Sequence, residues 1–363
     1  MNRINDLARA MEGSAGPDIS DEMLDNPGGN RRRWIRHFRI ANMSVIYAEI
    51  ALIIIFSLWA PSTFPTVTTF RSVLNGSAVP GLMALALVIP LSAKVFDLSI
   101  GNAMGLANML VAWLLVNHGW GIVPAILVTL VVGLAMGALN GLVVVNARID
   151  SFIGTLATGS LFVTFGSMLS NQSIFGNQLN GTFAKLASAH AFGLEVPTYL
   201  TVVVAITLWF FQRYTVSGRR IYALGFNERA SELIGIGAKR LKFLSLVLAG
   251  LVVSVAGILL ASSVNSGSPD IGPPYLLNAY AAAFLGSTQF GGRFNAWGTV
   301  LAVLLVNTGT NGIYLIGGAT WAQSMFSGVV LLVALGASNL EQAIRARAWI
   351  RAKARQQPER GAV

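Results

Sequence analysis

Side chains that could carry acid–base, nucleophilic or metal chemistry are scarce in this 363-residue sequence. It has no cysteine, and its three histidines (His37, His118 and His190) lie far apart, so the pattern predicts neither a disulfide nor a metal site. The dipeptide Gly-Lys is absent, which excludes a Walker A nucleotide-binding loop. No Ser–His–Asp set and no pair of carboxylates stands out. We therefore expect no catalytic site and no cofactor, and any ATP-driven activity would require a separate subunit.

Glu49 is the clearest ionisable residue inside an apolar stretch. Carboxylates within a membrane are energetically costly and usually mark function. Proton- or sodium-driven carriers usually need several such groups, and this sequence does not supply them. A carboxylate early in a helix is also favoured by the helix dipole alone, and we prefer that interpretation.

Neutral polar side chains are common in or beside the apolar stretches. Amide and hydroxyl groups donate and accept hydrogen bonds without adding charge, so as a set they suit a neutral, hydroxyl-rich solute. The alternative, which we favour for any single residue, is that they join helices to one another. The candidates for a translocation pathway are Asn102, Asn108, Asn140, Thr155, Asn278, Ser287, Thr288, Asn307 and Asn311.

The composition sets the fold class. Hydrophobic residues make up 54% of the chain and charged residues 11%, against about 25% charged in an average soluble domain. A net charge of +10 would suggest nucleic acid in a soluble protein, but here the basic residues lie between apolar runs. We therefore predict an all-α, polytopic membrane protein that lies in a lipid bilayer and binds no nucleic acid.

About ten stretches are long and apolar enough to span a bilayer, with a range of eight to eleven. We expect a flexible N-terminal tail over 1–40, a transmembrane domain over 41–340 and a basic C-terminal tail over 341–363. Pro80 and Pro90 are expected to break the second stretch. The ten are Ser44–Ala60, Ser77–Ala93, Leu98–Val116, Gly121–Val145, Phe152–Ser170, Pro197–Gln212, Phe243–Val264, Tyr275–Phe290, Ala296–Ile316 and Trp321–Leu340.

The basic residues predict the orientation. With the amino end inside, all of the 25 Lys and Arg except Arg71 and Lys185 fall in cytosolic segments. Cytosolic loops carry the excess of Lys and Arg, so both termini are predicted to be cytosolic.

The most informative cytosolic segment is the basic loop Arg213–Lys242. Its middle, Asn227–Ile236, reads as a short helix with Asn227 as N-cap and Gly235 as a stop signal. A short helix held in the cytosol between two spans is a natural docking element for a partner protein. An ordinary solvated loop is equally compatible with the pattern.

Four segments resemble permease subunits of the ribose/xylose/arabinose class of ABC importers. The first, Ser217–Ile236, reads SGRRIYALGFNERASELIGI and resembles the coupling-helix region of those permeases. Val95–Leu106, which reads VFDLSIGNAMGL, is similar to their Ile-Asp-Leu-Ser-Val-Gly signature. Asn140–Thr158 and Tyr275–Gly317 resemble two further family motifs. The resemblance covers about residues 47–336 in the same order and spacing.

The resemblance implies a permease subunit of an ATP-driven importer in the cytoplasmic (inner) membrane of a prokaryote, which moves a sugar or sugar alcohol by alternating access. Its partners would be cytosolic ATP-binding subunits, an extracytoplasmic solute-binding protein and a second permease copy, as a homodimer or a heterodimer. Asp97 and Ser99 would hold the cytosolic turn between the second and third spans. The ATPase-docking residues would be Asn227, Glu228, Arg229, Ala230, Ser231, Glu232 and Gly235.

Departures from the family pattern leave the solute open. Ser151 replaces the usual proline, Asn278 the usual acidic residue, and Ser287, Thr288 and Gln289 stand where the family has Gly-Thr-Ser. One alternative is a permease of the same superfamily for nucleosides or branched-chain amino acids. Another is a passive channel or scaffold without ATPase partners.

Overall fold

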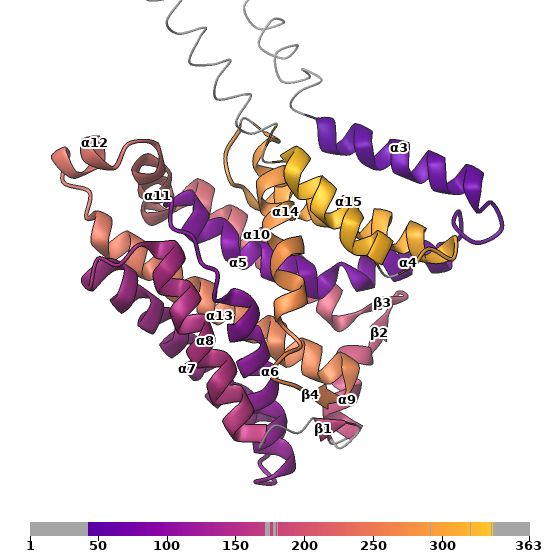
Figure 1. Ribbon diagram of the computed structural model, residues 1–363, viewed down its shortest axis with the longest axis horizontal. Helices are drawn as coiled ribbons and strands as arrows, with labels where there is room; N and C mark the ends of the chain where they lie inside the picture. The colour runs from indigo at the N-terminus through magenta and orange to yellow at the C-terminus, as the bar shows by residue number, and fades with distance from the viewer. Residues whose placement is uncertain are drawn as a thin grey trace, which may run out of the picture. The chain divides into compact units, whose positions relative to one another are not determined.

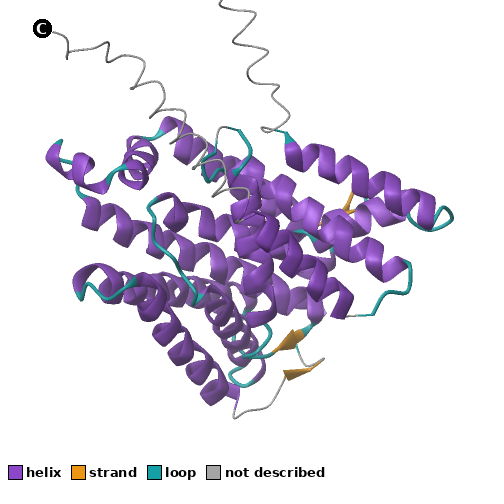
Figure 2. Cartoon of the chain, turned by 45° about the horizontal axis from the view of Figure 1, so that its top comes forward, coloured by secondary structure: helices purple, strands orange, loops and turns teal. Residues whose placement is uncertain are grey.

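The computed structural model describes residues 43–170, 175–176, 179, 181–290, 292–319, 321–334 and 336. The predicted tails, 1–40 and 341–363, lie outside the described residues. The described part is almost entirely helical (Figure 2), which confirms the all-α class. The helices are α3 (Ser44–Trp59), α4 (Val67–Gly76), α5 (Ala78–Ser92), α6 (Ile100–Val116), α7 (Ile122–Gly141) with its π-helical continuation η2 (Leu142–Asn146), α8 (Ser151–Ser170), α9 (Gly181–Ser188), α10 (Val196–Tyr214), α11 (Val216–Phe226), α12 (Glu228–Leu233), α13 (Ala238–Val264), α14 (Pro273–Ser287), α15 (Ala296–Leu315) and a last apolar helix, Trp321–Ala334.

Each of the ten predicted spans overlaps a helix among the described residues, and the end of the tenth lies outside them. Six helical runs are long and apolar enough to cross a membrane, which agrees with a multi-pass membrane protein. The exact number of spans and the side on which the tails lie stay predictions. The six runs are Val67–Ser92, Ile122–Asn146, Ser151–Ser170, Val196–Tyr214, Ala238–Val264 and Ala296–Leu315.

The predicted break in the second span is wrong. Helix α5 continues through Pro90, and Pro80 lies in its first turn, where backbone N–H groups have no intrahelical acceptor and a proline is tolerated. The sequence analysis also missed α4, which precedes α5 with only Ser77 between them. Together they form the 26-residue run Val67–Ser92.

The core forms around α5 and α13. Every residue of α5 except Pro80 is buried, as expected for a helix that is apolar on all sides. Helix α13 packs along α5, α6 and α7. A Cβ atom added at Gly137 of α7 would lie 2.4 Å from the carbonyl oxygen of Leu246 on α13, so only glycine permits this close helix approach.

Four two-residue strands form two small antiparallel pairs within the described residues. Strand β1 (Phe175–Gly176) pairs with β4 (Ser266–Gly267), and β2 (His190–Ala191) pairs with β3 (Leu194–Glu195). Because β3 leads directly into α10, the β2–β3 hairpin lies at one end of that helix and α11 with α12 at the other (Figure 1).

Candidate functional site

Helix α12 stands apart from the bundle and contacts only its chain neighbours α11 and α13 closely among the described elements (Figure 1). The Oδ1 atom of Asn227 accepts a 3.0 Å hydrogen bond from the backbone N–H of Ala230, which confirms the predicted N-cap. Helix α12 ends at Leu233, and Gly235 adopts φ +80°, so the helix is shorter than the predicted Asn227–Ile236.

Apolar side chains on this element face outward. Leu233 is 85% exposed and Ile234 74% exposed, and Phe226 at the end of α11 is also exposed. Of the other predicted docking residues, Glu228, Arg229, Ala230 and Glu232 are exposed and Ser231 is buried. A cluster of exposed large apolar residues on an otherwise charged helix is typical of a protein-binding surface.

One ion pair holds α12 against α13. The Nζ atom of Lys242 lies 2.6 Å from Oε1 of Glu228. The sequence analysis placed Glu228 at the helix start but did not predict Lys242 as its partner. This contact joins the start of α12 to the first turns of α13.

Asp97 and Ser99 lie in the turn between α5 and α6, where both are buried. The Oδ1 atom of Asp97 accepts hydrogen bonds from the backbone N–H and the hydroxyl of Ser99, at 3.0 and 2.6 Å. Asn140 on α7 donates to the carboxylate of Asp97 at 3.3 Å and to the Ser99 hydroxyl at 2.7 Å. Thr158 on α8 donates to the Asn140 carbonyl in turn. The turn is thus held by two neighbouring helices.

Two further hydroxyls complete this network. The backbone N–H of Leu98 donates to Thr155 on α8 at 2.9 Å, and that of Asp97 donates to the Tyr280 hydroxyl on α14 at 3.0 Å. Asn140 and Thr155, predicted as pathway residues, therefore position the turn of Asp97 and Ser99.

The other pathway candidates are distributed over three helices and mostly bind the backbone. Asn108 donates to the carbonyls of Gly257 and Ser266, and Asn307 donates to that of Val73 at 2.7 Å. These contacts join helices, which is the alternative that we favoured for single residues. Of the rest, Asn102 packs beside Gly159, Ser287 and Thr288 donate within their own helix end, Asn311 lies 3.5 Å from the Ser72 hydroxyl, and Asn278 is half-buried on α14.

Glu49 lies in the second turn of α3, and its contact is with another helix. Its Oε1 atom accepts a 2.7 Å hydrogen bond from the Thr308 hydroxyl of α15, while Oε2 is buried without a partner among the described residues. This carboxylate therefore links α3 to α15, and the helix-dipole interpretation stays a prediction. The carboxylate borders a cavity of about 420 Å³ between α3, α4 and α15.

Sequence reasoning missed a polar cavity of about 660 Å³ beside the β2–β3 hairpin. Its walls include Arg71 and Asn75 of α4, His190 and Glu195 of the hairpin, and Tyr275 of α14. Arg71 was one of two basic residues outside the predicted cytosolic segments, and that exception was the available signal.

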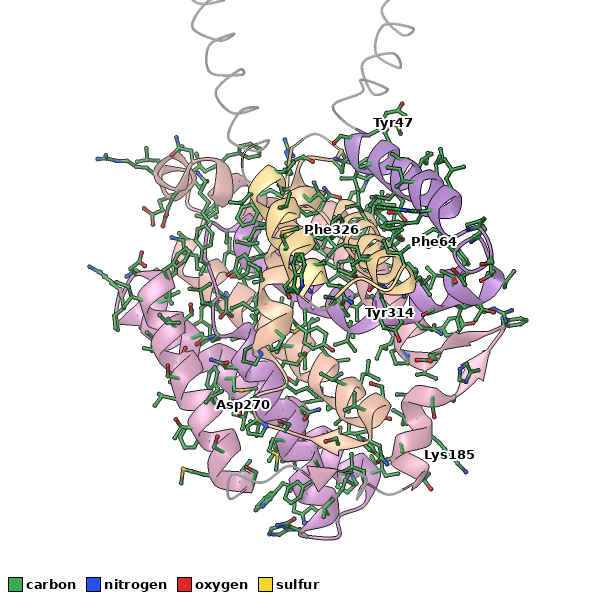
Figure 3. All side chains as sticks on the ribbon, turned by 45° about the vertical axis from the view of Figure 1, so that its right-hand side comes forward. Tyr47, Phe64, Lys185, Asp270, Tyr314 and Phe326 are labelled. Atoms are coloured by element: carbon green, nitrogen blue, oxygen red, sulfur yellow. The ribbon has the colours of Figure 1, made fainter. Side chains whose placement is uncertain are left out.

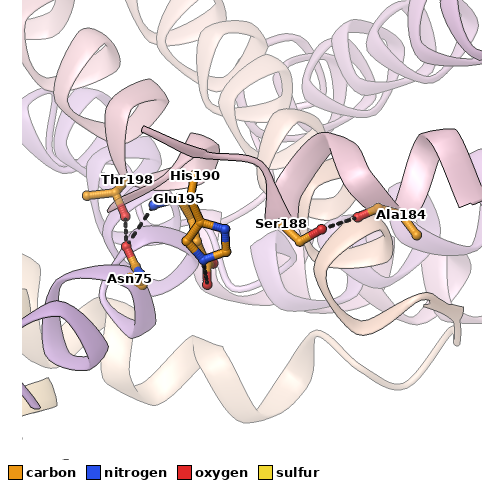
Figure 4. Close-up of polar contacts among 6 residues, drawn as sticks. All are labelled: Asn75, Ala184, Ser188, His190, Glu195 and Thr198. Atoms are coloured by element: carbon orange, nitrogen blue, oxygen red, sulfur yellow. Dashed lines mark hydrogen bonds and ion pairs between the residues drawn. The ribbon is translucent and has the colours of Figure 1, made fainter. Parts of the chain in front are cut away.

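Asn75 attaches the hairpin to α4. Its Oδ1 atom accepts hydrogen bonds from the backbone N–H of Glu195 at 3.0 Å and from the Thr198 hydroxyl at 2.9 Å (Figure 4). Across the hairpin, Nε2 of His190 lies 3.7 Å from Oε1 of Glu195 (Figure 4). The cavity is therefore lined by amide, hydroxyl and ionisable groups, and hydrogen bonds to Asn75 hold the hairpin that carries some of them.

On the predicted cytosolic side, Tyr222 of α11 joins this helix to the turn before α15. Its hydroxyl donates to the carbonyl of Phe294 at 2.6 Å. Burial raises the pKa of Tyr222 to about 12, although the nearby Arg293 opposes that shift. The Arg293 guanidinium also lies 4.7 Å from the centre of the Phe226 ring, a cation–π contact.

Comparison with known proteins gives the family. Residues 70–335 match the family described as "Branched-chain amino acid transport system / permease component". The chain is 30% identical over 319 residues to the ribose import permease protein RbsC of Escherichia coli (strain K12), covering 86% of this chain and 98% of that protein. RbsC of Bacillus subtilis (strain 168) is 34% identical over 286 residues, with 78% and 88% covered. The xylose transport system permease protein XylH of E. coli (strain K12) is 28% identical, with 80% and 90% covered.

The family match runs from within α4 to beyond the end of α15 and includes the loop that carries α12. These matches agree with the resemblance that four sequence motifs indicated. The chain belongs to this family of transport-system permease components.

Proposed function

We propose that the chain is the membrane-spanning permease subunit of an ATP-driven importer for a sugar or sugar alcohol. Three relatives with similarity over most of the chain are named for ribose or xylose. The described spans carry many amide and hydroxyl groups and few charges, which suits a neutral solute. We favour a sugar or sugar alcohol as the solute over a nucleoside or a branched-chain amino acid. We also favour an ATP-driven importer over a passive channel.

The observation that carries the ATP-driven part is the exposed face of α12. This helix is capped and ion-paired, yet Leu233 and Ile234 at its end are largely exposed. Such exposed apolar side chains indicate a surface that binds another protein. We propose that an ATP-binding subunit covers it in the cytosol. ATP hydrolysis then occurs on that partner, and α12 transmits the motion to its chain neighbours α11 and α13.

The remaining partners follow from the same proposal. A second permease copy, identical or similar, would complete the transport path in the cytoplasmic membrane of a prokaryote. A solute-binding protein would deliver the sugar at the opposite face from α12. The cavity of Arg71, Asn75, His190, Glu195 and Tyr275 lies at that face and is the entrance that we propose for the solute.

The test combines Leu233→Ser and Ile234→Ser in one variant of the full importer. We expect the ATP-binding subunit to lose co-purification with the permease and ATP-dependent uptake of ribose or xylose to stop. The matched control is Val202→Ser with Val203→Ser on α10, which removes two exposed apolar side chains (45% and 54% exposed) away from α12 and from the proposed entrance. Uptake that is unchanged in the α12 variant, or that proceeds without ATP, contradicts the proposal.

A further inference from the structure

The chain is not helical between α13 and α14. Helix α13 ends at Val264, Asn265 adopts the left-handed conformation at φ 48°, and α14 begins at Pro273. The connection contains β4, whose partner β1 lies about ninety residues earlier. It is therefore a structured segment that interrupts two apolar helices.

Asn108 of α6 anchors this segment within the bundle. Its Oδ1 atom accepts a 2.8 Å hydrogen bond from the backbone N–H of Ser268, and its Nδ2 atom lies 3.4 Å from the Ser266 carbonyl. Asn108 is fully buried. The predicted pathway residue thus holds the backbone on which Asp270 lies.

Glycines bring the segment against the sides of two spans. A Cβ at Gly105 of α6 would lie 2.1 Å from the carbonyl oxygen of Pro269, and one at Gly272 would lie 1.8 Å from that of Gly101. Gly166 of α8 faces Pro269 at 3.0 Å by the same measure. Asp270 is therefore flanked by positions inside α6 and α8, and Figure 3 shows it alongside these helices instead of beyond their ends.

The Asp270 side chain is exposed at this depth. Neither of the two ion pairs formed among the described residues involves it, and the next exposed residues, Pro273, Pro274 and Leu277, continue the same surface along α14. Non-helical backbone at membrane depth occurs only where protein covers it or where it lines a water-filled cavity. A carboxylate facing lipid is strongly disfavoured. A water-filled path satisfies both conditions.

We infer that Asp270 lines the solute path and binds the solute there, accepting hydrogen bonds from sugar hydroxyls. This inference rests on the proposed sugar import. A carboxylate has two acceptor oxygens and no donor, so it matches a pair of neighbouring hydroxyls on a polyol. Transporters commonly place solute sites at interrupted helices near mid-membrane, which agrees with this position.

Accessibility tests the location directly, because the chain has no cysteine of its own. We expect a charged methanethiosulfonate to modify the Asp270→Cys variant in the assembled importer. The matched control is Val203→Cys, midway along α10 and 54% exposed, where the thiol faces hydrocarbon and should stay unmodified. Ribose or xylose should slow the reaction at position 270. Equal reaction at both positions, or no protection by either sugar, overturns the inference.

Uptake tests the role. We expect Asp270→Ala to lower the rate of sugar uptake about tenfold or more, as the loss of a hydrogen bond to a charged group does, and Asp270→Asn to lower it less because one acceptor remains. Co-purification of the ATP-binding subunit should be unchanged in both. Wild-type uptake in Asp270→Ala overturns the inference and leaves the proposed function standing. Failure of the wild-type importer to take up either sugar counts against the proposed function instead.

Discussion

Asn140 donates from Nδ2 to both carboxylate oxygens of Asp97, at 3.3 Å each, although the two residues lie 43 positions apart in the sequence. The same amide donates to Ser99, and its carbonyl accepts from Thr158, so one side chain connects the turn after α5 to α7 and α8.

Asn140→Ala should therefore destabilise the fold. The substitution leaves the buried Asp97 carboxylate and the Thr158 hydroxyl without this partner. Removing the hydrogen-bond partner of a buried charged group typically lowers the free energy of unfolding by about 3 kcal/mol. Thermal unfolding of the purified permease measures the loss. The control is Thr164→Ala, which removes an exposed hydroxyl that donates within α8 and should change the free energy of unfolding by less than about 0.5 kcal/mol. Similar unfolding temperatures for both variants would show that the network contributes little.

Glu228→Lys with Glu232→Lys should abolish uptake while membrane insertion persists. Both side chains are exposed, and an exposed ion pair such as Glu228–Lys242 contributes only about 0.2–1 kcal/mol, so the fold should survive. Uptake would be lost because the ATP-binding subunit no longer docks on α12.

The swap Glu228→Lys with Lys242→Glu separates the two roles of Glu228. The swap restores an ion pair with reversed charges but not the charge that a partner would meet. Uptake should stay low. Recovery to the wild-type rate would mean that Glu228 acts only through Lys242.

Gly137→Ala should weaken the packing of α7 on α13. The added methyl group would lie 2.4 Å from the Leu246 carbonyl oxygen, and such overpacking costs about 1–3 kcal/mol. Gly328→Ala, in the last described helix, is the control because nothing lies within 4 Å of its added Cβ. An unfolding temperature for Gly137→Ala equal to that of the control would contradict the close approach of the two helices.

Tyr222→Phe should reduce the decrease in the free energy of unfolding at alkaline pH. Burial raises the pKa of Tyr222 to about 12, against about 10 in the unfolded chain, so the folded state keeps the proton after the unfolded state releases it. This contribution to the free energy of unfolding is complete below pH 10 and is lost as the pH rises to about 12. Melting curves at pH 8 and pH 11 should differ less for Tyr222→Phe than for the wild type. An identical difference would assign the alkaline loss to other groups.

The helical framework was predictable from the sequence because long apolar runs have few alternatives to a spanning helix. The α12 cap was equally predictable, since Asn227 acts on a residue only three positions away. Helix α4 was missed because its threonines, its serine and Arg71 make it less apolar than its neighbours. The hydropathy pattern likewise does not distinguish the π-helical continuation η2 from the α-helix α7.

The site was less predictable because its contacts are long-range. Nothing in the local pattern shows that Lys242 reaches back to Glu228, or that Asn75 of α4 binds the hairpin about 120 residues later. Asp270 was passed over because it looked like part of a loop between spans. The long-range packing of Pro269 and Gly272 on α6 places Asp270 alongside that helix.

The bond between Glu49 and Thr308 has a consequence for biosynthesis. Helix α3 packs mainly on α15, and the two bonded residues are separated by 259 positions. At about 5–20 residues per second, a ribosome needs roughly 13–50 s to cover that distance. During this interval the Glu49 carboxylate of α3 is without its Thr308 partner, so the insertion of α3 has to tolerate that unpaired carboxylate until α15 has been made.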